Sequence, residues 1–137
     1  MHRDPAQAES LKSIGATPVL GDLLKLDAQA LANLMADCDA VVFSAGAGGK
    51  ERTNAIDDGK GLELAVAAAQ QANIQRFLLV SVFPEAARGK EVSETFENYM
   101  AVKKQADVYL SATDLDWVIV RQVCYLMMKV LSKSIPV

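Results

Sequence analysis

A tyrosine and a lysine stand four residues apart in a helical segment, and this pair could carry proton chemistry. Tyr99 and Lys103 bracket the sequence Tyr-Met-Ala-Val-Lys. Positions i and i+4 share one face of a helix, so the ammonium can lie near the phenol. A nearby positive charge favours the phenolate and would lower the pKa of the tyrosine below its ordinary value. The pair is therefore suited to a general acid/base that exchanges a proton with an oxygen atom.

A second Tyr–Lys pair with the same spacing shows that the spacing alone does not identify a catalytic pair. Tyr125 and Lys129 fit the pattern equally well. Tyr99, however, follows a buried strand at 76–81 by one loop and begins a helix that leads to another apolar run at 117–120. Tyr125 lies in a terminal segment without such a frame. The flanking strands favour Tyr99 as the catalytic candidate. The alternative that stays open is that Tyr99 and Lys103 are ordinary residues on a helix surface.

Length, composition and charge exclude several classes of protein. The 137 residues are 51% hydrophobic and carry a formal net charge of −3. This length suits one domain. No apolar run approaches the roughly 20 residues of a membrane span, and the N-terminal residues lack the apolar core of a signal peptide. No basic cluster points to nucleic acid or an anionic membrane. We therefore expect a cytoplasmic protein with small-molecule partners.

The histidine and cysteine content argues against metal and triad chemistry. The single histidine, His2, lies near the terminus, which leaves no material for a histidine-based triad or a metal site. Cys38 and Cys124 are far apart in sequence, and we expect both to be reduced, buried thiols. We likewise expect Trp117, at the start of an apolar run, to belong to the core.

Helix and strand signals alternate along the chain, which predicts a parallel sheet covered by helices. Asp4 caps the first helix and Gly15 ends it, and Asp27 caps the second. In such sheets the ligand lies beyond the carboxyl ends of the strands. Polar and small residues that follow the strands are Asp22, Ser44, Gly46, Ser81 and Arg121. The predicted helices cover 5–14, 27–35, 54–72 and 93–113, and the predicted strands cover 17–20, 39–45, 76–81 and 116–121.

Two other motifs have a functional and a simpler interpretation. The glycines at 46–49, followed by Lys50, resemble a phosphate loop, but the spacing fails because Ser44 stands where a glycine is needed and Glu51 where a Ser or Thr is needed. A turn that lines a cofactor is the favoured interpretation, and a plain loop is the other. The carboxylates at 57–58 could act as an acid/base pair, but in an early helical turn they more often complement the helix dipole.

The ordered set of motifs resembles the atypical NAD(P)-binding short-chain dehydrogenase/reductases, the NmrA-like and epimerase-like Rossmann proteins. The resemblance covers about residues 2–121. The matching pieces are Arg3-Asp4-Pro5, Gly21-Asp22-Leu23, Cys38-Asp39-Ala40-Val41-Val42, Ser44-Ala-Gly-Ala-Gly-Gly49, Asp57-Asp58-Gly59, Arg76-Phe-Leu-Leu-Val-Ser81, Tyr99-x-x-x-Lys103 and Leu115-Asp-Trp-x-Ile-Val-Arg121.

This resemblance implies a role for each matched residue. Ser81 would hold a substrate carbonyl, Tyr99 would exchange its proton, and Lys103 would bind the nicotinamide ribose. On the cofactor side the implied residues are Arg3 at the adenosine ribose or its 2′-phosphate, Asp22 and Leu23 at the adenine, Ser44, Ala45 and Gly46 beside the ribose and nicotinamide, and Arg121. A guanidinium suits a 2′-phosphate, so NADP is favoured over NAD.

The chain departs from the family at both ends. The first strand, the glycine-rich G-x-x-G-x-x-G turn and the first helix are missing, because Met1 corresponds to the end of the second strand. After Arg121 the expected Pro-Gly is replaced by Gln122-Val, so we predict a partial Rossmann-like domain at 1–121 and a divergent tail at 122–137. The chain resembles an internal fragment.

These departures predict how the chain behaves by itself. In the strand order 3-2-1-4-5-6, loss of the first strands exposes one edge of the 41–45 strand, onto which the 17–20 strand could slide to give a four-stranded sheet. Open apolar edges invite self-association. We therefore expect a poorly stable chain without measurable dinucleotide affinity.

Three functions stay open from the sequence. The first is hydride transfer between a nicotinamide and a small carbonyl or alcohol, with Tyr99 as acid/base. The second is a non-catalytic, NmrA-like regulator that senses a dinucleotide. The third is an inactive fragment of either. Retention of Ser81, Tyr99 and Lys103 favours the enzyme.

Overall fold

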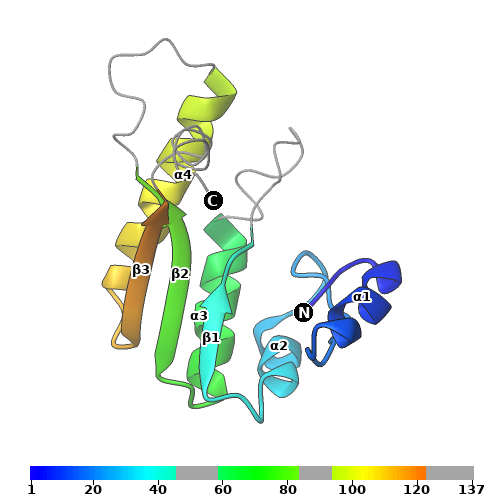
Figure 1. The fold of residues 1–137 in the computed structure, drawn as a ribbon. Coiled ribbons are helices and arrows are strands. Elements are labelled where there is room, and N and C mark those ends of the chain that lie inside the picture. The colour runs from blue at the N-terminus through cyan, green and yellow to red at the C-terminus, as the bar shows by residue number, and fades with distance from the viewer. Residues whose placement is uncertain (46–58, 84–93, 123–137) are drawn as a thin grey trace, which may run out of the picture.

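The computed structural model describes residues 1–45, 59–83 and 94–122 (Figure 1). In chain order the elements are the 3-10 helix η1 (Pro5–Gln7), α1 (Ala8–Ser13), α2 (Ala28–Leu34), β1 (Ala40–Phe43), α3 (Gly61–Gln71), β2 (Arg76–Val82), α4 (Glu94–Ser111) and β3 (Asp116–Gln122). This alternation confirms the predicted α/β class, and each predicted helix has a counterpart among the described elements.

The strands form a parallel sheet in the order β1-β2-β3. Val41 lies opposite Phe77, which lies opposite Trp117 in the third strand. Because all three strands run the same way, their carboxyl ends meet at one edge of the sheet, to which the arrowheads in Figure 1 point. The exposed edge predicted for the 41–45 strand is confirmed, because β1 pairs with β2 and is the first strand of the sheet.

The core lies between the sheet and helices α3 and α4, which lie together behind it in Figure 1. Every second residue of β2 is buried, beginning with Phe77 and continuing with Leu79 and Ser81. This period of two is expected for a strand with one covered face. Leu62 of α3 and Leu110 of α4 are at most 1% exposed. Burial of these side chains, each contributing on the order of 1.5–3 kcal/mol, holds the sheet and helices together.

Within the described residues the other face of the sheet is exposed, so the predicted cover of helices lies on one face only. Val42 is 65% exposed, and Val118 and Val120 are about half exposed. Trp117 is 39% exposed rather than part of the core, because β3 is the last strand of the described sheet and its indole lies at that margin.

Both N-terminal caps are confirmed. The Asp4 carboxylate accepts a hydrogen bond from the amide of Ala6 at 2.9 Å, and Asp27 accepts one from Ala30 at 2.8 Å. Gly15 follows α1 with a φ of +83°, a left-handed conformation that glycine adopts without strain. The caps fix where these short helices begin.

The predicted strand at 17–20 is reduced to a single parallel bridge between Leu20 and His2. The amide of His2 donates to the carbonyl of Val19 at 2.8 Å, and the amide of Gly21 donates to the carbonyl of His2 at 2.9 Å. A longer strand needs a partner along its whole length, and among the described residues this segment has a bridge partner in His2 alone. The suggested slide of this segment onto β1 is also wrong, because β1 pairs only with β2 in the described chain.

Cys38 is exposed, which corrects the expectation of a buried thiol. It lies on the short connection between α2 and β1, beside an open groove, and no described element covers it. Within the described ranges, no helix is long and apolar enough to cross a membrane.

Candidate functional site

A cavity of about 470 Å³ opens where the carboxyl end of β1 meets the N-terminal segment. It brings together five residues that the sequence predicts to bind a cofactor: Arg3, Asp22, Leu23, Ser44 and Ala45. These residues come from three separate segments of the chain. Their convergence at the carboxyl end of a parallel strand is what the sheet geometry predicts for a ligand site.

Short local structures hold the cavity's two charged residues. The Asp22 carboxylate accepts a hydrogen bond from the amide of Leu24 at 3.1 Å, an Asx turn that fixes its direction. Arg3 follows His2, whose backbone amide and carbonyl each form a hydrogen bond with the 19–21 segment. The His2 ring lies 9% exposed, with Nδ1 2.9 Å from the carbonyl oxygen of Asp4. His2 therefore anchors Arg3, a structural role that no feature of the sequence indicated.

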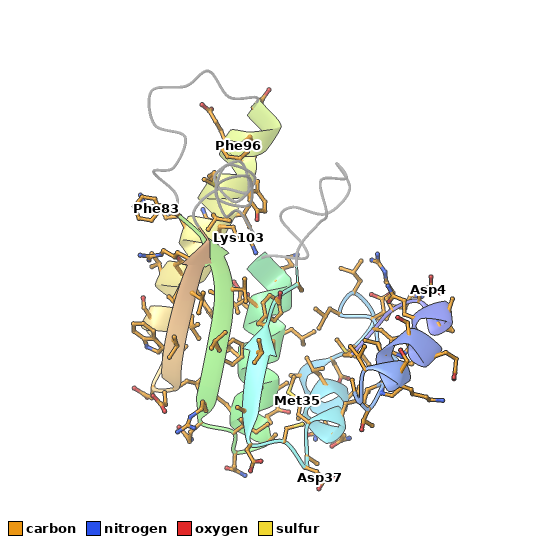
Figure 2. The ribbon with its side chains drawn as sticks, viewed as in Figure 1. Asp4, Met35, Asp37, Phe83, Phe96 and Lys103 are labelled. Carbon is orange, nitrogen blue, oxygen red and sulfur yellow. The ribbon has the colours of Figure 1, made fainter. Side chains whose placement is uncertain are left out.

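Lys103 connects the catalytic candidates to this cavity. Its side chain reaches from α4 to the carboxyl-end edge of the sheet, as Figure 2 shows, and is only 4% exposed. Nζ donates to the carbonyl oxygen of Ala45 at 3.4 Å and lies 5.7 Å from the centroid of the Tyr99 ring. The second distance is within the range of a cation–π contact. The spacing of Tyr99 and Lys103 thus places the two groups together, as predicted.

Ser81 lies near the end of β2 on the face that the helices cover. Its side chain is 2% exposed, and its Oγ has no hydrogen-bond partner in the described part of the structure. A buried hydroxyl without a partner costs about 1–3 kcal/mol, so such groups usually have a specific reason to persist. A ligand oxygen would supply the missing bond.

Arg121 lies apart from the cavity at the end of β1. Its Nε donates to Oδ2 of Asp107 on α4 at 3.0 Å, and the two residues line a separate hollow with Trp117 and Ser111. Asp107 is 5% exposed, and its Oδ1 has no partner within the described residues. The sequence did not single out Asp107, because an acid in a helix is ordinarily solvated.

Several sequence candidates lie outside the described residues. These are Gly46 and the rest of the glycine loop, Asp57, Asp58 and the second pair at Tyr125 and Lys129. Within the described ranges, no group of three or more His, Cys, Asp or Glu side chains could hold a metal ion.

A parallel α/β sheet with a cavity at the carboxyl end of a strand is the arrangement in which open α/β proteins bind ligands such as dinucleotides. The family model described as NAD(P)H-binding matches residues 1–126. The chain therefore belongs to this NAD(P)H-binding family, in agreement with the epimerase-like Rossmann resemblance of its motifs.

Named relatives agree with this assignment. The chain is 34% identical over 124 residues to the uncharacterized sugar epimerase YhfK of Bacillus subtilis, covering 88% of this chain and 56% of the relative. A solved structure from Bacillus halodurans, described as a NAD-dependent epimerase/dehydratase, is 28% identical with a TM-score of 0.72, covering 87% of this chain and 55% of that one.

A third comparison is with the oxidoreductase ylbE of Lactococcus lactis. It is 26% identical with a TM-score of 0.64, covering 77% of this chain and 49% of that one. The UDP-glucuronic acid 4-epimerase of Bacillus cereus, solved in complex with NAD, shares the fold at 19% identity with a TM-score of 0.61. The match covers 84% of this chain and 42% of that one. The chain spans about half the length of these relatives.

Proposed function

We propose that the protein is a NAD(P)-dependent enzyme of the reductase/epimerase type, acting on a carbon that carries an alcohol or carbonyl oxygen. One observation carries the proposal. The buried Lys103 contacts both the Tyr99 ring and the Ala45 carbonyl, which lines the predicted nucleotide cavity. A single side chain therefore joins the acid/base candidate to the cofactor side of the site.

The residues of the reaction side have complementary chemistry. When bound, the nicotinamide would supply or accept the hydride. Tyr99 would give a proton to the substrate oxygen or take one from it. Ser81 would donate a hydrogen bond to the same oxygen through its unpartnered Oγ. Lys103 would orient the nicotinamide ribose, and its positive charge would favour the tyrosinate.

The residues of the cavity fit the adenosine half of a dinucleotide. A guanidinium, a carboxylate and the apolar Leu23 side chain line it together, which suits a phosphate, a ribose hydroxyl and an adenine ring. Arg3 is exposed at the mouth of this cavity, so its guanidinium can approach a 2′-phosphate. We therefore propose that NADPH is preferred over NADH.

The test uses two forms of the protein. In the extended chain, a strand, glycine-rich turn and helix from a family member precede Met1, because a turn of that kind supplies the amide groups that hold a pyrophosphate. Calorimetric titration should show micromolar NADPH binding by the extended chain and none measurable by the 137 residues alone. Absorbance at the reduced-nicotinamide band then follows turnover with small carbonyl compounds, and chromatography of the products follows epimerisation of nucleotide sugars, in which the hydride returns to the substrate and the cofactor shows no net change.

Each result has a definite meaning. Cofactor oxidation with one substrate class would support the enzyme and name its substrate. Binding without turnover across the panel would favour the dinucleotide-sensing regulator. Absence of binding by a folded extended chain would contradict the dinucleotide function.

A further inference from the structure

Arg121 joins β3 to helix α4 beside the reaction side of the site. It stands in register with Ser81 on the neighbouring strand, so the two side chains leave the sheet on the same face. On that face the Nε of Arg121 donates to Oδ2 of Asp107 at 3.0 Å. The Arg121 side chain is 47% exposed and that of Asp107 only 6%. Arg121 is therefore the partner of a carboxylate that is almost fully buried.

Asp107 stands one helical turn beyond Lys103, and Tyr99 stands one turn before it. Residues four apart share a helix face, so the Lys103 side chain could reach either of them. Tyr99 and Asp107 are separated by about 12 Å along the helix axis, at 1.5 Å per residue. One ammonium group cannot contact both at once. In the structure Nζ lies 5.7 Å from the centroid of the Tyr99 ring and donates to the carbonyl oxygen of Ala45.

The carboxylate of Asp107 is a strong competitor for this ammonium. Lys103 and Asp107 are both at most 5% exposed, so opposite charges attract more strongly there than on an exposed helix surface. A carboxylate is also a better acceptor for an ammonium than the neutral carbonyl of Ala45, which Nζ reaches at 3.4 Å. A buried carboxylate without a cation is costly. Without Arg121, Asp107 would therefore draw Lys103 away from Tyr99.

We propose that Arg121 is a positioning residue: it pairs with Asp107, removes the competing anion and so leaves Lys103 directed at Tyr99. The consequence for catalysis rests on the proposed function, but the direction of Lys103 can be measured without a nucleotide. A simple tether between helix and strand would need both members of the ion pair. Here only the arginine is needed, because a neutral side chain in place of Asp107 would not compete for the ammonium.

The first measurement uses the 137-residue chain without nucleotide, labelled with ¹³C-lysine for nuclear magnetic resonance. The ring current of Tyr99 displaces the Hε resonance of Lys103, and Tyr99→Leu gives the position of that resonance without the ring. Arg121→Met keeps an apolar stem and removes the guanidinium, and it should lose most of the displacement. Arg76→Met is the matched control, because the Nε of Arg76 also lies beside Oδ2 of an aspartate, Asp116, at 3.6 Å. The control should leave the Lys103 resonance unchanged.

A neutral residue at position 107 separates positioning from tethering. Asp107→Asn should keep the displacement of the Lys103 resonance, and the double variant Asp107→Asn/Arg121→Met should restore it, because no anion remains to compete. In the extended chain, turnover should follow the same pattern. It should fall at least about tenfold in Arg121→Met and stay close to the parent in the other two variants. If Arg121→Met does not fold, Arg121→Gln provides the same test, since its amide can donate to the carboxylate without a charge.

Two results would overturn the inference. Equal losses in Asp107→Asn and Arg121→Met would show that the pair only tethers the helix to the strand. An unchanged Lys103 resonance in folded Arg121→Met would show that Asp107 does not draw this lysine and takes another cation, such as the exposed Lys104. The expected resonances in a chain that turns over no substrate would support the role of Arg121 in directing Lys103 and contradict the proposed enzyme instead.

Discussion

The two halves of the candidate site are held by different kinds of structure. On the reaction side, Ser81 and Lys103 are 2% and 4% exposed, and they extend from a paired strand and a helix of eighteen residues. On the nucleotide side, Arg3 and Asp22 lie on irregular segments joined by a single parallel bridge. The reaction half is therefore fixed by the core, and the nucleotide half depends on a few local hydrogen bonds.

This difference indicates which half of the candidate site tolerates amino-acid substitution. A side chain packed between sheet and helix cannot move without opening a cavity in the core. A residue on a connecting segment can shift with little loss of buried area. Substitutions on the reaction side should therefore have large effects, and those on the nucleotide side should be small and specific to one ligand group.

The largest effect is expected from Tyr99→Phe in the extended chain. Loss of the phenolic proton should lower turnover by about 10²–10⁴-fold while NADPH affinity is nearly unchanged, because only proton exchange is removed. Steady-state kinetics and calorimetry measure the two quantities. The control is Tyr109→Phe, since Tyr109 lies on the same helix and is 40% exposed. Equal activities of the two variants would remove Tyr99 from the reaction.

Next in size is the effect of Leu79→Ala on stability. Leu79 is 1% exposed in the core beneath the reaction half, so its truncation should lower the free energy of unfolding by about 2–5 kcal/mol. Leu24→Ala is the matched change on the nucleotide side, where the leucine is 46% exposed, and it should cost less than about 1 kcal/mol. Urea unfolding measures both. Similar losses would end the distinction between a packed and an open half.

A smaller effect, shared by both halves, is expected from Lys103→Met. The variant keeps the apolar stem and removes the ammonium that contacts the Ala45 carbonyl and the Tyr99 ring. Turnover and NADPH affinity should both fall, by about tenfold or more in each. Lys104→Met, an exposed neighbour, is the control. A loss of turnover with unchanged affinity would confine Lys103 to the reaction half.

The smallest effect is expected from Arg3→Ala. Removal of the guanidinium should weaken NADPH binding about tenfold, or about 1.4 kcal/mol, and leave NADH binding almost unchanged. Calorimetric titration with the two nucleotides gives the difference. Arg76→Ala is the control, because Arg76 is exposed at the amino end of β2. Its Nε lies 3.6 Å from Oδ2 of Asp116. Parallel losses for both nucleotides would show that Arg3 does not contact a 2′-phosphate.

Local patterns in the sequence determined much of the fold and part of the site. The caps at Asp4 and Asp27 and the turn at Gly15 depend on neighbouring residues alone, and each has the predicted conformation. The spacing of Tyr99 and Lys103 also acts within one helical turn, and the structure places them in contact range. The convergence of residues after β1 follows from parallel strands, which the alternation of elements implies.

Burial was decided by the tertiary structure, because it depends on which elements lie on each side of a strand. The same apolar run occurs in strands with one covered face and in strands with two, so Val42 proved exposed on the uncovered face. Trp117 is in register with the buried Phe77 but belongs to the last strand of the described sheet, where it is 39% exposed. The strand length at 17–20 depended on a pairing partner, and within the described ranges this segment forms a single bridge, to His2. The ion pair between Arg121 and Asp107 joins a strand to a helix, and no local spacing encodes it. Helix caps, turns and i, i+4 pairs depend on neighbouring residues. Burial and strand pairing depend on which distant segments come together.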